Sequence, residues 1–229
     1  MNRFHSLGAA GALVAVSTAF AGTVTVGPDT LAGSGHAVAP GYNFQGGLFN
    51  LTVNSLSGVS GGDLVIGNTF KSFCIEIGET VAFNGSYNYA VNTASISGGS
   101  SPNNPQPLVV QTAWLYSQYR AGALTAGGDA FVENNSDTNA LQDAIWFFQN
   151  QLGSTASTDL SARAQQFVAA ANASGWTTIG NVRVLNMGSG TVNPPYPNQD
   201  MLVLIPLPQG AGLASVGLLL VGARRRRSL

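Results

Sequence analysis

The periodicity of the chain changes twice, and this change limits the possible folds more than any other feature of the sequence. From residue 22 to residue 103, short segments rich in β-branched and aromatic residues alternate with glycine-containing breaks. Such segments predict strands, and Gly61-Gly62 and Asn84-Gly85 predict turns. The stretch 97–107, SGGSSPNNPQP, predicts a loop. The expected strands are TVTVG, FNLTVNSL, DLVIG, FKSFCIEI and YNYAVNTASI.

Helical spacing replaces this pattern in the second half of the chain. The segment 107–122, PLVVQTAWLYSQYRAG, carries apolar residues at helical spacing and ends at a glycine. A second helix is expected from residue 137 or 138 to residue 153, and a third from 159 to 175. The strand-like segments TIGNVRVLNM and QDMLVLI follow. The order strands, helices, strands predicts an α+β domain, with a β-rich sandwich or barrel-like part and an inserted bundle of about three helices.

Residues 1–21 have the layout of a secretory signal peptide. Arg3 and His5 precede an uncharged, mostly apolar stretch, and Ala19-Phe20-Ala21 offers small residues for cleavage. The stretch is too short to anchor the chain across a membrane. A buried N-terminal helix is the alternative, but the glycines and the lack of a polar face argue against it. We therefore expect export, with a mature domain formed by residues 22–205.

Residues 206–229 form a tail in three parts. A Pro-x-Pro element precedes an uncharged, mostly apolar run, 210–223, which is expected to form a short helix, and a cluster of arginines closes the chain. This arrangement resembles the PEP-CTERM sorting signal of bacterial exported proteins. The resemblance implies transient or permanent anchoring in the inner membrane and recognition by an exosortase-like processing enzyme; a plain tail anchor is the alternative. The motif residues are Pro206, Leu207, which stands where the family has glutamate, Pro208, Arg224, Arg225, Arg226 and Arg227.

The charge of the expected mature domain excludes some partners. Residues 22–205 contain all ten acidic residues but only four of the nine basic ones, so their net charge is close to −6. Because no basic stripe is available to meet phosphates, a nucleic-acid partner is not expected. The length fits a single domain.

Cys74 is the only cysteine of the chain, so an exported form cannot build an intramolecular disulfide. One explanation is that Cys74 is a small buried hydrophobe, a common situation for a free cysteine. Its surroundings suggest another. The stretch FCIE, 73–76, lies on an expected strand, and LQDAIW, 141–146, lies on the first turns of the second expected helix.

These two stretches together resemble the thioester domains of bacterial surface adhesins. In that family an aromatic-Cys-Ile-Asp-like strand and a Gln-x-Ala-Ile-Trp helix supply an internal Cys–Gln thioester, and Trp114 to Tyr116 resembles the preceding helix. The resemblance implies a thioester between Cys74 and Gln142, with possible support from Glu76, Trp146 and Trp114. Glu76 stands where the family usually has aspartate, and Leu141 where it often has threonine.

The implied function is covalent adhesion at the cell surface or in the extracellular matrix, to protein amines or polysaccharide hydroxyls. This is acyl transfer performed once, without turnover or a cofactor, so an enzyme is not expected. A hydrolase is a minor alternative, because His36 is the only histidine of the mature region. Cysteine and histidine are also too few for a zinc site, and no metal is expected. The main alternative is a non-reactive structural or exopolysaccharide-associated surface protein that is sorted through its tail.

Overall fold

The computed structural model describes residues 22–29, 32–39, 42–56, 58–96, 106–153, 156–188 and 198–205, with the backbone alone at 32–39 and 42–45. The expected signal peptide (1–21), most of the expected loop 97–107 and the tail 206–229 with its apolar helix lie outside these residues. Within the described part of the chain, no helix has both the length and the apolar character needed to cross a membrane.

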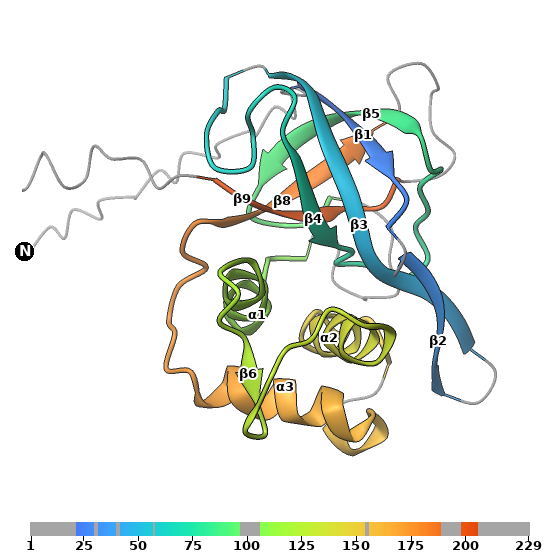
Figure 1. Ribbon diagram of the computed structural model, residues 1–229, viewed down its shortest axis with the longest axis vertical. Coiled ribbons are helices and arrows are strands. Elements are labelled where there is room, and N and C mark those ends of the chain that lie inside the picture. The colour runs from blue at the N-terminus through green and yellow to red at the C-terminus, as the bar shows by residue number, and fades with distance from the viewer. Residues whose placement is uncertain are drawn as a thin grey trace, which may run out of the picture.

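Seven strands form one antiparallel sheet (Figure 1). β-branched and aromatic residues predominate in β1 and β4, as expected for half-buried strands. The order of neighbours is β2-β3-β1-β5-β8-β9, and β4 pairs with β3. The strands are β1 (Gly22–Gly27), β2 (Ala32–Ala39), β3 (Tyr42–Leu56), β4 (Thr69–Phe73), β5 (Gly85–Asn92), β8 (Val182–Gly188) and β9 (Met201–Leu204).

The end of β4 nearly closes this sheet into a barrel. Cys74, directly after β4, forms an isolated antiparallel bridge with Met201 of β9. The backbone N–H of Ile75 donates to the carbonyl oxygen of Asp200 at 3.1 Å. Since β4 also pairs with β3, the two ends of the sheet meet beside Cys74.

The helices are inserted between β5 and β8 and pack together on one side of the barrel (Figure 1). Two of them begin at side-chain caps: Asn134 accepts from the N–H of Asp137, and Ser161 from that of Ala164. This arrangement confirms the α+β class. The inserted elements are α1 (Val110–Arg120), the strand pair β6 (Thr125–Ala126) and β7 (Asp129–Ala130), α2 (Asn135–Phe148), the short 3-10 helix η1 (Ser157–Asp159) and α3 (Ala162–Ala173).

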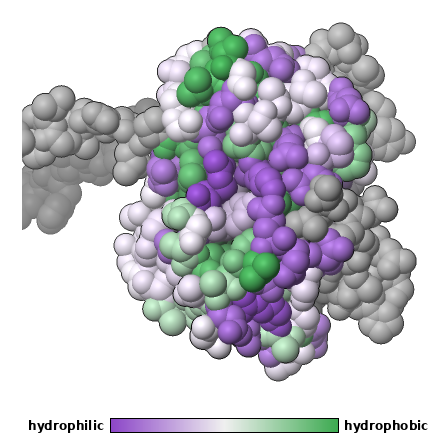
Figure 2. Space-filling view, in the orientation of Figure 1, coloured by the Kyte–Doolittle hydropathy of each residue, from purple (hydrophilic) through white to green (hydrophobic). Residues whose placement is uncertain are grey.

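Two hydrophobic clusters occupy the two faces of the barrel wall. In β9, Met201 and Val203 belong to the cluster inside the barrel, whereas Leu202 belongs to the cluster between barrel and helices. Neighbouring strand residues point to opposite faces, so one strand serves both clusters. The exposed hydrophobic side chains are scattered, and the face drawn in Figure 2 shows small separate hydrophobic patches among hydrophilic ones.

The structure corrects several sequence-based element assignments. DLVIG, 63–67, forms turns instead of a strand, and Val65 and Ile66 are exposed. The fixed position of Asp63 explains this, because its carboxylate accepts two hydrogen bonds from Arg120, at 2.6 and 2.7 Å, and one from the N–H of Leu204. The expected strand FKSFCIEI ends at Phe73, and β2, with many small residues, was not expected at all.

Asp137 ties the start of α2 to α3. Its carboxylate accepts from Nε and Nη2 of Arg163, both at 3.0 Å, and from the N–H of Val132 at 2.9 Å. Burial of Asp137 opposes ionisation, but the bonds from Arg163 and Val132 outweigh it, so the pKa of Asp137 is lowered from 3.8.

Replacing Asp137 by asparagine is expected to reduce the free energy of unfolding by about 2 kcal/mol at pH 7. Because the folded-state pKa lies below the unfolded value, this contribution is complete above about pH 4 and is lost as the pH falls through the folded-state pKa. Urea unfolding at pH 7 and pH 3 measures it. The exposed Asp129→Asn variant is the control, with a change within about 0.5 kcal/mol. An equal loss for Asp137→Asn at both pH values would contradict the prediction.

Candidate functional site

The β3–β4 ladder ends beside Cys74, and a glutamine side chain continues it. The last paired residues are Leu48 and Phe73, and extending this antiparallel register by one residue sets Gly47 opposite Cys74. Oε1 of Gln142 accepts from the N–H of Gly47 at 3.2 Å and from that of Cys74 at 3.3 Å. Its Nε2 donates to the carbonyl oxygen of Cys74 at 2.8 Å. The Gln142 carboxamide therefore lies between the two strands where their own ladder stops.

The structure thus brings together the two residues that the sequence paired. Cys74 and Gln142 are each 1% exposed. The contacts between the two residues run through the backbone of Cys74, whose N–H donates to Gln142 Oε1 and whose carbonyl oxygen accepts from Gln142 Nε2.

Two features place the carboxamide there. The apolar stripe of α2 includes the fully buried Leu141 and Ile145, which hold this face of the helix against the core. Gly46 then allows β3 to approach the helix. A Cβ atom at Gly46 would lie 2.5 Å from Cη2 of Trp146, closer than side chains tolerate, and at a tight 3.1 Å from Cγ of Gln142.

The hydrogen bonds to Oε1 have a chemical consequence. Two backbone N–H groups aimed at one carbonyl oxygen polarise the carbonyl group, and they stabilise the negative charge that develops on the oxygen when a nucleophile attacks the carbon. The distances of 3.2 and 3.3 Å are slightly longer than the 2.7–3.1 Å expected for a tightened oxyanion site. The arrangement is a pair of donors in place before any reaction.

The N-terminus of α2 lies too far along the helix from Gln142 to act on its carboxamide. Residues 141–146 were expected on the first turns of the helix, but α2 begins at Asn135, so Gln142 is its eighth residue. The effect of the helix dipole falls off within the first turn. The backbone N–H groups of Gly47 and Cys74 therefore replace the helix N-terminus as the source of positive potential at Oε1.

The sulfur of Cys74 is held as a protonated thiol. Burial raises the pKa of Cys74 well above its usual value, and the nearby charge of Glu79 adds to the rise. Cys74 belongs to the cluster inside the barrel, together with Trp146 of α2. Cys74 is thus a buried small side chain whose backbone bonds to the Gln142 carboxamide.

The expected supporting residues separate in space. Trp146 is 1% exposed and packs beside Gly46, next to the Gln142 carboxamide. Trp114 packs against the cluster on the helix side. The carboxylate of Glu76 lies with those of Glu79 and Asp200, and Glu79, not Glu76, raises the pKa of Cys74. The sorting motif, residues 206–208 and 224–227, lies outside the described residues.

Sequence reasoning missed the carboxylate group and the two glycines. Glu76 and Glu79 are close in sequence, but Asp200 comes from the far end of the chain and joins them only because β9 closes the barrel. Gly46 and Gly47 are adjacent within FQGGLFN, the one sequence signal that could have marked a close approach of the backbone.

No protein-family model matches the chain, and no curated protein or solved structure is significantly similar to it.

Replacing Gly46 by alanine should displace Trp146 and Gln142 from β3 and lower the free energy of unfolding by about 1–3 kcal/mol. Gly27→Ala is the matched control, because Gly27 also lies in a strand of this sheet. A Cβ at Gly27 would meet its nearest atom at 3.5 Å, an ordinary van der Waals contact. Urea unfolding of both variants measures the difference. Equal stability of the two would show that α2 does not depend on the close approach at Gly46.

Proposed function

We propose that this chain is an exported bacterial surface or matrix protein in which Cys74 and Gln142 form an internal thioester for covalent adhesion. The observation that carries the proposal is the bracketing of the Gln142 carboxamide by the backbone of Cys74 and the N–H of Gly47. A buried glutamine could satisfy its hydrogen bonds in many ways. Gln142 bonds instead to the backbone of the only cysteine of the chain, and its side-chain carbonyl oxygen accepts from two backbone N–H groups.

The reaction balances without a cofactor. The sulfur of Cys74 attacks the side-chain carbonyl carbon of Gln142, the bond from that carbon to Nε2 breaks, and the thiol proton joins the departing nitrogen as ammonia. Positioning supplies most of the acceleration, because the two groups are held together by the fold. A target amine or hydroxyl then attacks the same carbon. The carbon–sulfur bond breaks, the sulfur takes up the proton of the nucleophile, and Gln142 becomes the permanent link.

The surroundings suit a stored electrophile. Lys71, the only lysine, is engaged with Asp29 and Glu133 and so is not directed at Gln142. Trp146 helps to exclude water from the carboxamide. Since Cys74 and Gln142 are almost fully buried, an attacking group must enter past neighbouring segments. Small amines should therefore react faster than bulky ones.

The two ends of the chain complete the proposal. Residues 1–21 would direct export, and residues 206–229 would hold the protein in the inner membrane until an exosortase-like enzyme processes the tail. The acidic domain between them would then present the thioester outside the cell, where protein amines and polysaccharide hydroxyls are available.

Intact-mass measurement of the protein expressed from its full gene tests the thioester. The isolated form should be lighter than its sequence mass by one ammonia. Treatment with methylamine should add one methylamine and release a thiol that titrates. Cys74→Ala and Gln142→Ala should both carry their full sequence mass and ignore methylamine, because each lacks one half of the bond.

Gln151→Ala is the matched control. Gln151 is also a buried glutamine, and its Oε1 accepts from the N–H of Ile77, close to Cys74 in sequence. Its variant should keep the mass deficit. A native protein of full sequence mass, with a thiol that titrates once the protein is unfolded, would contradict the thioester.

The same contact supports a second candidate, the non-reactive structural surface protein. In this function Gln142 caps the open end of the β3–β4 ladder, because its Oε1 accepts a backbone hydrogen bond and its Nε2 donates one. Cys74 then only fills space in the hydrophobic core. Burial of the thiol favours this candidate because a protonated sulfur is a poor nucleophile. The full sequence mass is its expected result.

A further inference from the structure

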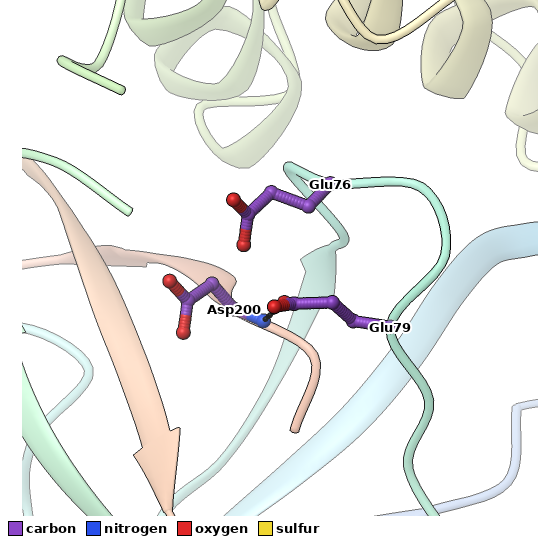
Figure 3. Close-up of side chains that lie close together, drawn as sticks. All are labelled: Glu76, Glu79 and Asp200. Carbon is purple, nitrogen blue, oxygen red and sulfur yellow. Dashed lines mark hydrogen bonds between the residues drawn. The ribbon is translucent and has the colours of Figure 1, made fainter. Parts of the chain in front are cut away.

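Three buried carboxylates meet beside the seam of the barrel (Figure 3). Glu76 and Glu79 come from the bend after β4, and Asp200 directly precedes β9. One oxygen from each residue lies within 4.8 Å of the others. Their exposed fractions are 2%, 6% and 0%, so water does not screen the charges.

Two oxygens of this group, Oε2 of Glu76 and Oε1 of Glu79, are fully buried and accept no hydrogen bond from an N–H or hydroxyl group of any described residue. The side chains of Glu76 and Glu79 lie within hydrogen-bonding reach of each other, so a proton or a cation must lie between them. A buried polar atom without a partner is costly and calls for an explanation, such as a bound ion. Figure 3 shows the carboxylate of Glu76 extending toward those of Glu79 and Asp200.

Within the described part of the chain, no basic side chain bonds to this group. The donors to Asp200 there are neutral: the N–H groups of Ile96 and Met187 and the side chain of Asn186. Among the described residues the basic side chains bond elsewhere: Lys71 to Asp29 and Glu133, Arg120 to Asp63, Arg163 to Asp137, and Arg183 to the carbonyl oxygens of Gly180 and Val182.

We propose that Glu76, Glu79 and Asp200 bind one hard divalent cation, of which Ca²⁺ fits best. All three ligands are carboxylate oxygens, which Ca²⁺ and Mg²⁺ prefer, while nitrogen and sulfur ligands are absent from the set. Oxygens bound to one Ca²⁺ at about 2.3–2.6 Å lie at most about 5 Å apart, and this group meets that limit. Each oxygen has a second lone pair, so Asp200 can keep its hydrogen bonds while it binds.

The pKa values of the three carboxyl groups are all raised, as expected for carboxylates that lie close together without a neighbouring positive charge. Burial and the neighbouring Glu76 raise the pKa of Glu79 to about 10, and burial with the charge of Glu76 raises that of Asp200 well above its usual value. Burial also raises the pKa of Glu76. A divalent cation would remove this mutual repulsion.

A cation here would fix the segment that carries Cys74. The bend between Glu76 and Glu79 is joined to the segment before β9 by a hydrogen bond from Gln199 Nε2 to the carbonyl oxygen of Glu76, at 2.7 Å, and by a longer one from the N–H of Asp200 to Glu79, at 3.4 Å. Linking both glutamates to Asp200 would hold the barrel closed next to the Cys74–Met201 bridge. This site does not require the thioester, so either proposal can fail alone.

Calorimetric titration of the full chain with Ca²⁺, after treatment with EGTA, tests the site. One Ca²⁺ should bind per chain at Ca²⁺ concentrations up to about 10 mM. This range is chosen because the weakest extracellular calcium sites have millimolar dissociation constants. Saturation should raise Tm by about 5 °C or more when Ca²⁺ exceeds Kd about 100-fold. Mg²⁺, which is smaller and holds its waters, should bind more weakly.

Glu79→Gln is the decisive variant, because the hydrogen bond that Glu79 accepts from the N–H of Asp200 is long, at 3.4 Å. It should weaken Ca²⁺ binding at least tenfold and be as stable as the wild type in EGTA at neutral pH, since a pKa of about 10 leaves Glu79 uncharged there, as glutamine is. Asp129→Asn, an exposed aspartate, should bind as the wild type does. The absence of Ca²⁺ binding by the wild type, or equal binding by Glu79→Gln, would overturn the site.

Discussion

The contact between the Gln142 carboxamide and the backbone at Gly47 and Cys74 joins the two parts of the molecule. Hydrophobic packing also holds the helices on the barrel, and Arg120 and Tyr116 of α1 add hydrogen bonds to Asp63 and to the carbonyl oxygen of Leu202. A buried carboxamide must find all its partners in one place, so it fixes where α2 sits on the strands. The surroundings of the Cys74 backbone depend on this position.

The seam of the barrel concentrates the polar groups of the interior. The β3–β4 ladder ends at Phe73 and the β8–β9 ladder ends at Met201, which leaves the backbone between them without a continuous strand partner. Side chains fill the gap: Gln142 on one side, and the carboxylates with Gln199 on the other. Reactive and ion-binding groups would thus occupy the place where regular pairing stops, within one short stretch of chain.

Much of the fold could be read from periodicity. Val24 and Val26 of TVTVG are fully buried, and the second and third helices lie where their apolar stripes predicted, with ends shifted by a few residues. Predictions failed where a particular tertiary contact decided the conformation. DLVIG has strand-like composition, yet the bonds of Asp63 to Arg120 and Leu204 hold it in a turn. Likewise, FKSFCIEI stops being a strand at Phe73, where Ile75 turns to bond with Asp200.

The sequence by itself determined the class of the fold and the acidic character of the domain, because these depend on composition and period, and its resemblance to thioester domains suggested that Cys74 and Gln142 belong together. Only the tertiary structure decided what surrounds them. Gly47 supplies its N–H to Gln142 because the register of β3 against β4 sets it opposite Cys74. Asp200 meets Glu76 and Glu79 because the barrel closes there. Contacts between residues far apart in the chain follow from strand register and closure, which local sequence preference does not encode.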